Sequence, residues 1–224
     1  MPPTLTSIRR KASDNTLEVE HILEAASQRI DGLPDLLDEL SVTEDWSDVT
    51  HLPDGTHVVP LARWARVASA YCRDGISGLR AVLSSPNHES FVLALLEELH
   101  SSQAVDAAMD FFSVCIRTPG EDPLLARKIA NSLNLILCFK PEVEIGGAAM
   151  EQIRAFATEL IQISSDQVDR AVPVLLLRAV GDESSLQLLD SLPEFTEHWA
   201  STIPATRRAI RNRLKKKKGQ QAAS

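Results

Sequence analysis

The stretch RAVPVLLLRAVGDESSLQLLDSL, residues 170–192, holds two apolar segments separated by Gly181 and Asp182. Pro173 lies inside the first segment, which is otherwise typical of a buried helix. A proline within a helix removes one backbone N–H donor and bends the helix axis. Asp182 is a favourable N-cap for a helix over the second segment. The stretch therefore predicts two helices joined by a short turn, the first of them bent around its neighbours.

The same alternation of helix and short turn runs through most of the chain. No segment alternates apolar and polar residues at turn spacing, so we expect essentially no β-sheet. Helix pairs that recur about every 35–45 residues are typical of an α-solenoid, because one hairpin alone cannot bury its apolar face. Apolar residues recur at helical spacing in residues 16–30, 34–40, 60–72, 74–83, 85–101, 103–116, 121–139, 145–163, 165–180, 183–192 and 196–218.

The composition favours the same all-α fold. Apolar residues make up 44% of the 224, enough to bury a core, whereas aromatic residues make up only 4%. Leu and Ala predominate instead, and such side chains lose little rotamer freedom in a helix. We therefore expect an all-α protein.

These features resemble HEAT repeats, a family of armadillo-like α-solenoids. In that family the first helix of a pair often carries a proline, an Asp lies in the turn, and the second helix often carries a Val-Arg pair ahead of an Ala and a Leu. Pro173 and Asp182 match the first two features. Residues 122–133, DPLLARKIANSL, match the turn and the second helix better. Gln187 departs from the pattern, since it stands near the place of the family's arginine.

The resemblance covers residues 60–214 and implies a right-handed superhelical stack of antiparallel helix pairs. The repeat lengths are uneven, which is a second departure from the family. In residues 122–133 the matching positions are Asp122, Pro123, Arg127, Ala130 and Leu133.

The chain divides into four predicted regions. Residues 1–13 form a basic N-terminus that we expect to be disordered. Residues 14–59 are expected to hold the N-terminal helices and a long acidic loop that together cap the solenoid. Residues 60–214 hold the helical repeats, and residues 215–224 form a basic tail that we expect to be disordered.

Cysteine usage and hydropathy indicate a cytoplasmic protein. Cys72, Cys115 and Cys138 are odd in number and widely spaced, so they predict neither a disulfide framework nor a paired metal motif. Each lies in an apolar helical stretch, which suits a reducing compartment. The N-terminus lacks the apolar core of a secretory signal, and no run of 18 apolar residues occurs. We therefore expect a cytoplasmic location without a membrane span.

Charge is distributed unevenly along the chain. Residues 207–218 carry eight of the 23 basic residues and no acid, and residues 9–11 carry three more. Residues 12–206 hold 12 basic and all 31 acidic residues, a net charge of −19. An acidic body attracts basic partners and repels the phosphates of nucleic acids. Nucleic-acid binding is therefore expected, if at all, only through the basic tail.

Residues with metal-binding or catalytic chemistry are few. None of the six histidines forms an HExxH motif. Glu97 and His100, three residues apart, are either half of a metal site or an ordinary surface pair near a helix end. His88-Glu89 is a lone His-Glu dipeptide, whereas the HEAT-like deoxyhypusine hydroxylases bind two irons through several. We therefore expect no metal, no cofactor and no catalytic residue.

The stretch EDWSDVTHLPDGTH, residues 44–57, is the best candidate for a specific contact. Long loops in compact domains are usually functional or disordered. A tryptophan beside carboxylates suits the centre of an interface with a basic protein. The predicted protein-binding residues are Glu44, Asp45, Trp46 and Asp48. In the alternative interpretation Trp46 packs onto the first helices and the acids are solvated.

The function that these observations predict is a non-enzymatic module whose acidic helical surface binds a basic protein. One specific version is an immunity protein, a small acidic protein that blocks a basic toxin by charge-steered association. That version rests on size, charge and analogy of fold. The alternatives are an enzyme on a HEAT-like scaffold, such as a lyase or a glycosylase, and a subunit of a larger regulatory assembly.

Overall fold

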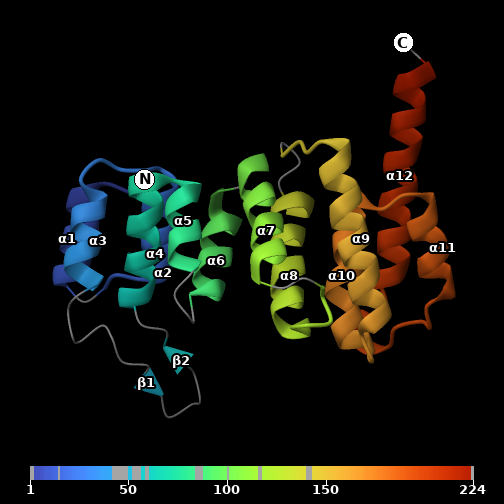
Figure 1. Cartoon of the computed structure of the whole chain (residues 1–224), viewed down its shortest axis with the longest axis horizontal. Helices are drawn as coiled ribbons and strands as arrows, with labels where there is room; N and C mark the ends of the chain where they lie inside the picture. The colour runs from blue at the N-terminus through green and yellow to red at the C-terminus, as the bar shows by residue number, and fades with distance from the viewer. Residues whose placement is uncertain are drawn as a thin grey trace. The chain divides into compact units, whose positions relative to one another are not determined.

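The protein folds into helices that form two compact units, Met1–Leu99 and His100–Ser224 (Figure 1). The structure is a computed structural model that describes residues 3–14, 16–41, 50–51, 57–58, 61–83, 88–99, 101–115, 118–139 and 143–222. Strands occupy only four of these residues, Thr50–His51 (β1) and His57–Val58 (β2), which pair antiparallel. The prediction of an all-α fold is confirmed.

The N-terminal unit is built around one central helix, α4. Its helices are α1 (Leu5–Ser13), α2 (Val19–Ser27), α3 (Leu33–Ser41), α4 (Leu61–Asp74), α5 (Ile76–Leu83) and α6 (Glu89–Leu99). Helix α4 packs against α2, α3, α5 and α6, and α6 also contacts α2 and α5. Fully buried side chains of the core include Ile22, Leu37, Ala65 and Leu95.

Helices α4 and α5 approach each other closely at two glycines. Gly75 has a φ of +61°, a left-handed conformation that ends α4 and that glycine adopts without strain. One turn later, a Cβ at Gly78 would lie inside the van der Waals distance of the Ala70 carbonyl oxygen. The absence of a side chain at Gly78 therefore allows α5 to pack directly on the backbone of α4.

The C-terminal unit is built around α10 in the same way. Its helices are α7 (Ser102–Cys115), α8 (Pro123–Phe139), α9 (Gly147–Ile163), α10 (Gln167–Val180), α11 (Glu183–Ser191), the 3-10 turn η2 (Glu197–Trp199) and α12 (Thr202–Ala222). Helix α10 packs against α8, α9 and α12, whereas α7 packs against α8 and α11 against α12. Ile129, Leu133, Leu160 and Leu177 are completely buried in this core.

The decisive stretch 170–192 forms the two predicted helices. Pro173 is buried inside α10, which continues through it. Asp182 is the N-cap of α11, and its carboxylate accepts a hydrogen bond from the Ser185 backbone N–H at 3.0 Å. Helix α10 packs against α9, which precedes it in the chain, and also against α8 and α12, which are each two α-helices away in the chain.

Both chain ends differ from the prediction of disorder. Residues 5–13 form α1, because Thr4 and Ser7 make a capping box at its start and Ile8 is buried, with 1% of its surface exposed. Helix α12 runs on to Ala222 and so includes residues 215–222 of the basic tail. Lysine has a high helix propensity, and the tail extends a helix that is already nucleated by packing.

Within the described part of the chain, none of the helices combines the length and the apolar character that crossing a bilayer requires.

Candidate functional site

The predicted loop residues Glu44, Asp45, Trp46 and Asp48 lie outside the described residues. Most of the described acidic residues that precede them in the chain lie on two helices, α2 and α3. The chain enters this loop from α3, which ends at Ser41.

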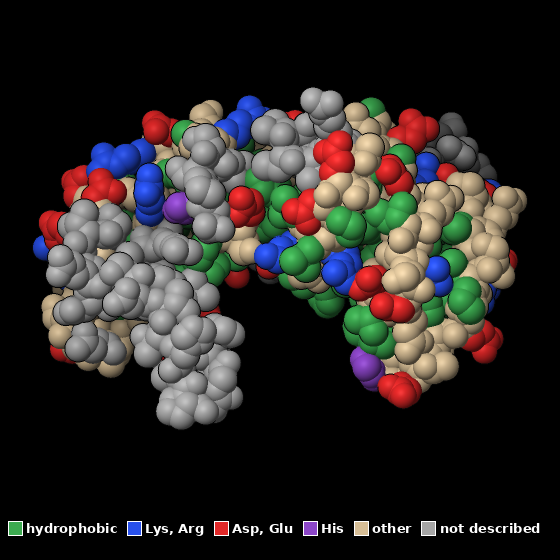
Figure 2. Space-filling model, turned by 60° about the horizontal axis from the view of Figure 1, so that its bottom comes forward, with side chains coloured by type: hydrophobic (Ala, Val, Ile, Leu, Met, Phe, Trp, Pro, Cys, Tyr) green, Lys and Arg blue, Asp and Glu red, His purple; other side chains and the backbone are tan. Residues whose placement is uncertain are grey.

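Residues 18–39, the acidic segment, run from the N-cap of α2 to the last turn of α3. They contain seven carboxylates and one basic residue, Arg29. All seven carboxylates are exposed: Glu18, Glu20, Glu24, Asp31, Asp35, Asp38 and Glu39. Acidic side chains of the N-terminal unit are visible in red in the left-hand part of Figure 2. The acidic segment thus presents most of its charge to solvent.

The amphipathic pattern of the two helices explains this exposure. In α3 the leucines at 33, 36, 37 and 40 are buried, whereas Asp35, Asp38 and Glu39 lie on the other side. In α2, Ile22 and Ala26 are buried, whereas Glu20 and Glu24, one turn apart, are exposed. Both helices pack against α4, so the apolar core of the unit holds the acidic segment in place.

Arg73 of α4 organises two of these carboxylates. Its Nη2 atom lies 3.0 Å from Asp35 Oδ1 and 2.5 Å from Asp38 Oδ2. Ser69 donates its hydroxyl to Asp38 Oδ1 at 2.6 Å. The hydrogen bond and the charge of Asp38, with a smaller effect of Asp35, raise the pKa of Arg73. The arginine therefore fixes the direction of two carboxylates on α3 while staying exposed itself.

The other acids of the segment keep their charge available. Among the described residues, Glu20, Glu24, Asp31 and Glu39 form no ion pair, and Glu18 lies 3.9 Å from the ring of His21. Glu20 and Glu24 are like charges four residues apart on one helix, which costs a few tenths of a kcal/mol. A cationic group bound here would relieve that repulsion as well as add its own attraction.

The structure describes only some of the candidate metal-binding residues. His88 is buried with 8% exposure and makes contacts of its own, and His100 lies outside the described residues. His51 and His57 are paired positions of the β1–β2 ladder. In the described ranges, no group of three or more His, Cys, Asp or Glu side chains is placed to hold a metal ion.

The cysteines with described side chains are poor nucleophiles. Cys72 and Cys138 are free thiols, each half-buried. Burial raises the pKa of the Cys72 thiol to about 11, although Arg29 opposes this shift. Burial also raises the pKa of Cys138, against the charges of Arg178 and Arg213. Because the thiolate is the reactive form, both side chains are largely unreactive near pH 7.

The sequence predicts protein binding by Glu44, Asp45, Trp46 and Asp48, and this stays a prediction because these residues lie outside the described ranges. The signal for the acidic segment was present, since seven acids face one arginine over 22 residues. The contribution of Arg73 had no local signal, because it comes from a helix more than 30 residues further along the chain.

Comparison of the chain with protein-family models, with curated proteins and with solved structures finds no match. What the protein does therefore has to follow from its own residues, charges and contacts.

Proposed function

We propose that the protein is a non-enzymatic protein-binding module that binds a basic protein partner on its acidic segment. The observation that carries this proposal is that residues 18–39 expose seven carboxylates and contain one basic residue, with Asp35 and Asp38 paired to Arg73 of α4. A surface of one sign steers an oppositely charged partner and raises its association rate about 10- to 1,000-fold. The predicted binding residues Glu44, Asp45, Trp46 and Asp48 begin five residues after Glu39 in the sequence and add three more acids to it.

A solenoid-like helical scaffold suits this function. In each unit, alternate helices pack against one another: α2, α4 and α6 in the first, and α8, α10 and α12 in the second. Layers of this kind are typical of stacked helical repeats, which supports a HEAT-like right-handed superhelix. Such scaffolds present extended surfaces for protein partners. An immunity-type inhibitor of a basic toxin is the specific version that acidity and size favour.

Co-purification of the full chain from native cells, in the presence of nuclease, tests the proposal. A stoichiometric basic protein that is retained at low salt and lost at high salt is the expected result. Nuclease removes partners that are held only through nucleic acid. Absence of a protein partner at both salt concentrations would contradict the proposal.

Charge-neutralising variants locate the binding surface. Glu24→Gln/Glu39→Gln removes two exposed charges of the acidic segment, and Glu151→Gln/Glu194→Gln removes two exposed charges of the C-terminal unit. We expect the first variant to slow association with the captured partner several-fold at low salt. The second variant has the same net charge, so an equal effect of both would show that the acidic segment is not the binding surface.

A further inference from the structure

A cavity of about 630 Å³ lies within the C-terminal unit. It is bounded by the end of α8, the segment that leads into α9, the end of α10 and the middle of α12. Ligand-binding pockets are typically between about 300 and 1,000 Å³ in volume. The cavity is distinct from the acidic segment, which belongs to the N-terminal unit.

The walls of the cavity are mainly apolar. Leu137, Phe139, Val143, Ile145 and Met150 contribute to them, and Phe139 has 65% of its surface exposed. An exposed phenylalanine at the edge of a cavity offers apolar area that an apolar ligand would remove from water, at about 25 cal/mol per Å². The lining therefore favours a ligand with an apolar body.

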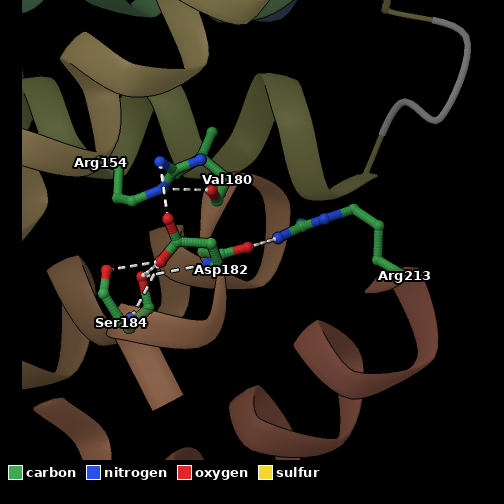
Figure 3. Close-up of polar contacts among 7 residues, drawn as sticks. Arg154, Val180, Asp182, Ser184 and Arg213 are labelled. Atoms are coloured by element: carbon green, nitrogen blue, oxygen red, sulfur yellow. Dashed lines mark hydrogen bonds and ion pairs between the residues drawn. The ribbon is translucent and has the colours of Figure 1, made fainter. Parts of the chain in front are cut away.

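Two arginines, Arg178 of α10 and Arg213 of α12, give the cavity a cationic side. The guanidinium of Arg213 is committed to the end of α10, where it donates to the Arg178 carbonyl oxygen at 2.5 Å and to the Gly181 carbonyl oxygen. Arg154 of α9 serves the same helix end, since its Nε donates to the Val180 carbonyl oxygen at 2.9 Å (Figure 3). These arginines satisfy carbonyl groups that a helix C-terminus leaves without partners.

Asp182 is a carboxylate that pairs with an arginine at this helix end. Asp182 pairs with Arg154, with 2.8 Å between Oδ2 and Nη1, and its other oxygen caps α11. Burial lowers the pKa of Arg213, and the charge of Arg154 lowers it further. Asp182 thus interacts with Arg154 directly and with the charge of Arg213, whereas Arg178 forms no ion pair with a described residue.

Arg178 lines the cavity and uses its Nε donor in a hydrogen bond to α12. Its Nε donates to Thr206 Oγ1 at 3.3 Å, and within the described ranges it forms no ion pair. Glu144 also lines the cavity, but it is exposed and forms no ion pair with a described residue. A half-buried guanidinium without a carboxylate partner is strongly attracted to an anion that can bind it through two parallel hydrogen bonds.

We propose that this cavity binds an apolar carboxylate, with the apolar body against Phe139, Ile145 and Met150 and the carboxylate on Arg178. A single negative charge fits better than a multiply charged group, because Glu144 lines the same cavity and repels further charge. The inference goes beyond the proposed function and does not depend on it. An apolar carboxylate has two sources, a free small molecule and the C-terminal residue of a peptide.

Calorimetric titration of the full-length protein with octanoate, octan-1-ol and octylamine tests the charge requirement. These probes share a chain length and differ in the charge of the head group. We expect octanoate to bind at least about tenfold more tightly than octan-1-ol, as a charge-assisted hydrogen-bonded pair implies, and octylamine more weakly than both. Equal affinity for octanoate and octan-1-ol, or no binding of octanoate at millimolar concentration, would overturn the proposal.

Two substitutions locate the site. Arg178→Gln should weaken octanoate binding about tenfold or more and leave octan-1-ol binding unchanged, because only the ion pair is lost. Arg208→Gln is the matched control, since Arg208 is an exposed arginine of α12 that does not line this cavity. Ala209→Leu, which adds volume to the cavity wall, should weaken both probes. Unchanged octanoate binding by Arg178→Gln and by Ala209→Leu, with native circular dichroism, would place the ligand elsewhere.

A peptide arm distinguishes the two sources of carboxylate. The probes are acetyl-Ala-Ala-Leu with a free C-terminus and the same peptide with a C-terminal amide. Tighter binding of the free-acid peptide than of octanoate indicates the C-terminus of a protein, whereas the reverse order indicates a small molecule. Either order of affinity supports the cavity as a site for an apolar carboxylate. Equal affinity for the free-acid and the amide peptide would show that the cavity does not recognise a peptide's C-terminal carboxylate.

Discussion

The carboxylate of Asp182 caps α11 and pairs with Arg154 of α9. Its removal should therefore destabilise the C-terminal unit in a pH-dependent way. The carboxylate accepts hydrogen bonds from Ser184 Oγ at 2.7 Å and from the Ser185 backbone N–H at 3.0 Å, and it pairs with Arg154 at 2.8 Å. Burial by itself raises the pKa of Asp182, but these hydrogen bonds together with Arg154 outweigh burial and hold the pKa below its ordinary 3.8.

Two substitutions separate the two contributions of Asp182. Asp182→Asn keeps a side-chain oxygen for the N-cap and loses the ion pair, so we expect a loss of about 1–2 kcal/mol in the free energy of unfolding at pH 7. Asp182→Ala loses the cap as well, which adds about 1 kcal/mol. Asp190→Asn is the control. Asp190 also pairs with an arginine, Arg207, but it is 60% exposed, and its loss should cost less than about 1 kcal/mol.

The pH dependence follows from the direction of the shift. A carboxyl group whose pKa is lower in the folded state than in the unfolded state adds stability above the unfolded pKa, and this contribution is lost as pH falls through the folded pKa. The gap in stability between the native protein and Asp182→Asn should therefore be complete at pH 7 and should shrink below about pH 4. Urea unfolding, with hydrogen exchange of residues 183–191 to locate the effect in α11, measures this gap. An equal gap at pH 7 and pH 3, or equal losses for Asp182→Asn and Asp190→Asn, would refute the reasoning.

Three further predictions concern other parts of the molecule. Gly78→Ala places a methyl group against a carbonyl oxygen of α4, so it should lower the free energy of unfolding, measured in urea, by about 1–3 kcal/mol. The control Ser77→Ala, at an exposed neighbouring position, should change it very little. Similar losses for the two variants would contradict the close approach of α4 and α5. Burial raises the pKa of Cys72 to about 11, so iodoacetamide should alkylate this thiol at pH 8 about a hundredfold more slowly than free cysteine. Peptide mapping measures the rate, and a rate equal to that of free cysteine would show that the thiol is not buried. A chain that ends at Leu214 should unfold thermally at the same midpoint as the full chain, since the described lysine side chains beyond it are exposed, whereas a chain that ends at Ala209 loses the fully buried Ile210 and should melt at a lower temperature.

Much of the helical structure was predictable because its signals are local. The helical spacing of apolar residues indicated most of the helices, and the Gly-Asp break indicated the turn between α10 and α11. Asp182 was recognised as an N-cap because capping involves residues only three positions apart. Helix α1 was missed, because its sequence is dominated by polar and basic residues and its one buried side chain, Ile8, depends on tertiary packing.

The candidate sites were predictable only in part. The density of acids in residues 18–39 is visible in the sequence, whereas protein binding by residues 44–48 stays a prediction, since they lie outside the described ranges. Arg73 reaches Asp35 and Asp38 only because α3 and α4 pack together. The cavity has no sequence motif at all, since its lining comes from separate segments of residues 137–213.

Local patterns in the sequence were enough to predict a helical protein, most helix boundaries, and a division of charge between an acidic body and a basic end. These properties depend on side-chain spacing and on groups a few residues apart. Local patterns do not indicate that α10 packs against α8, α9 and α12. They also do not indicate that Arg154 and Arg213, 59 residues apart in the chain, both donate to carbonyl groups at the end of α10. Contacts at such separations depend on how whole helices pack, because many side chains must be buried together before any one of these pairs can form.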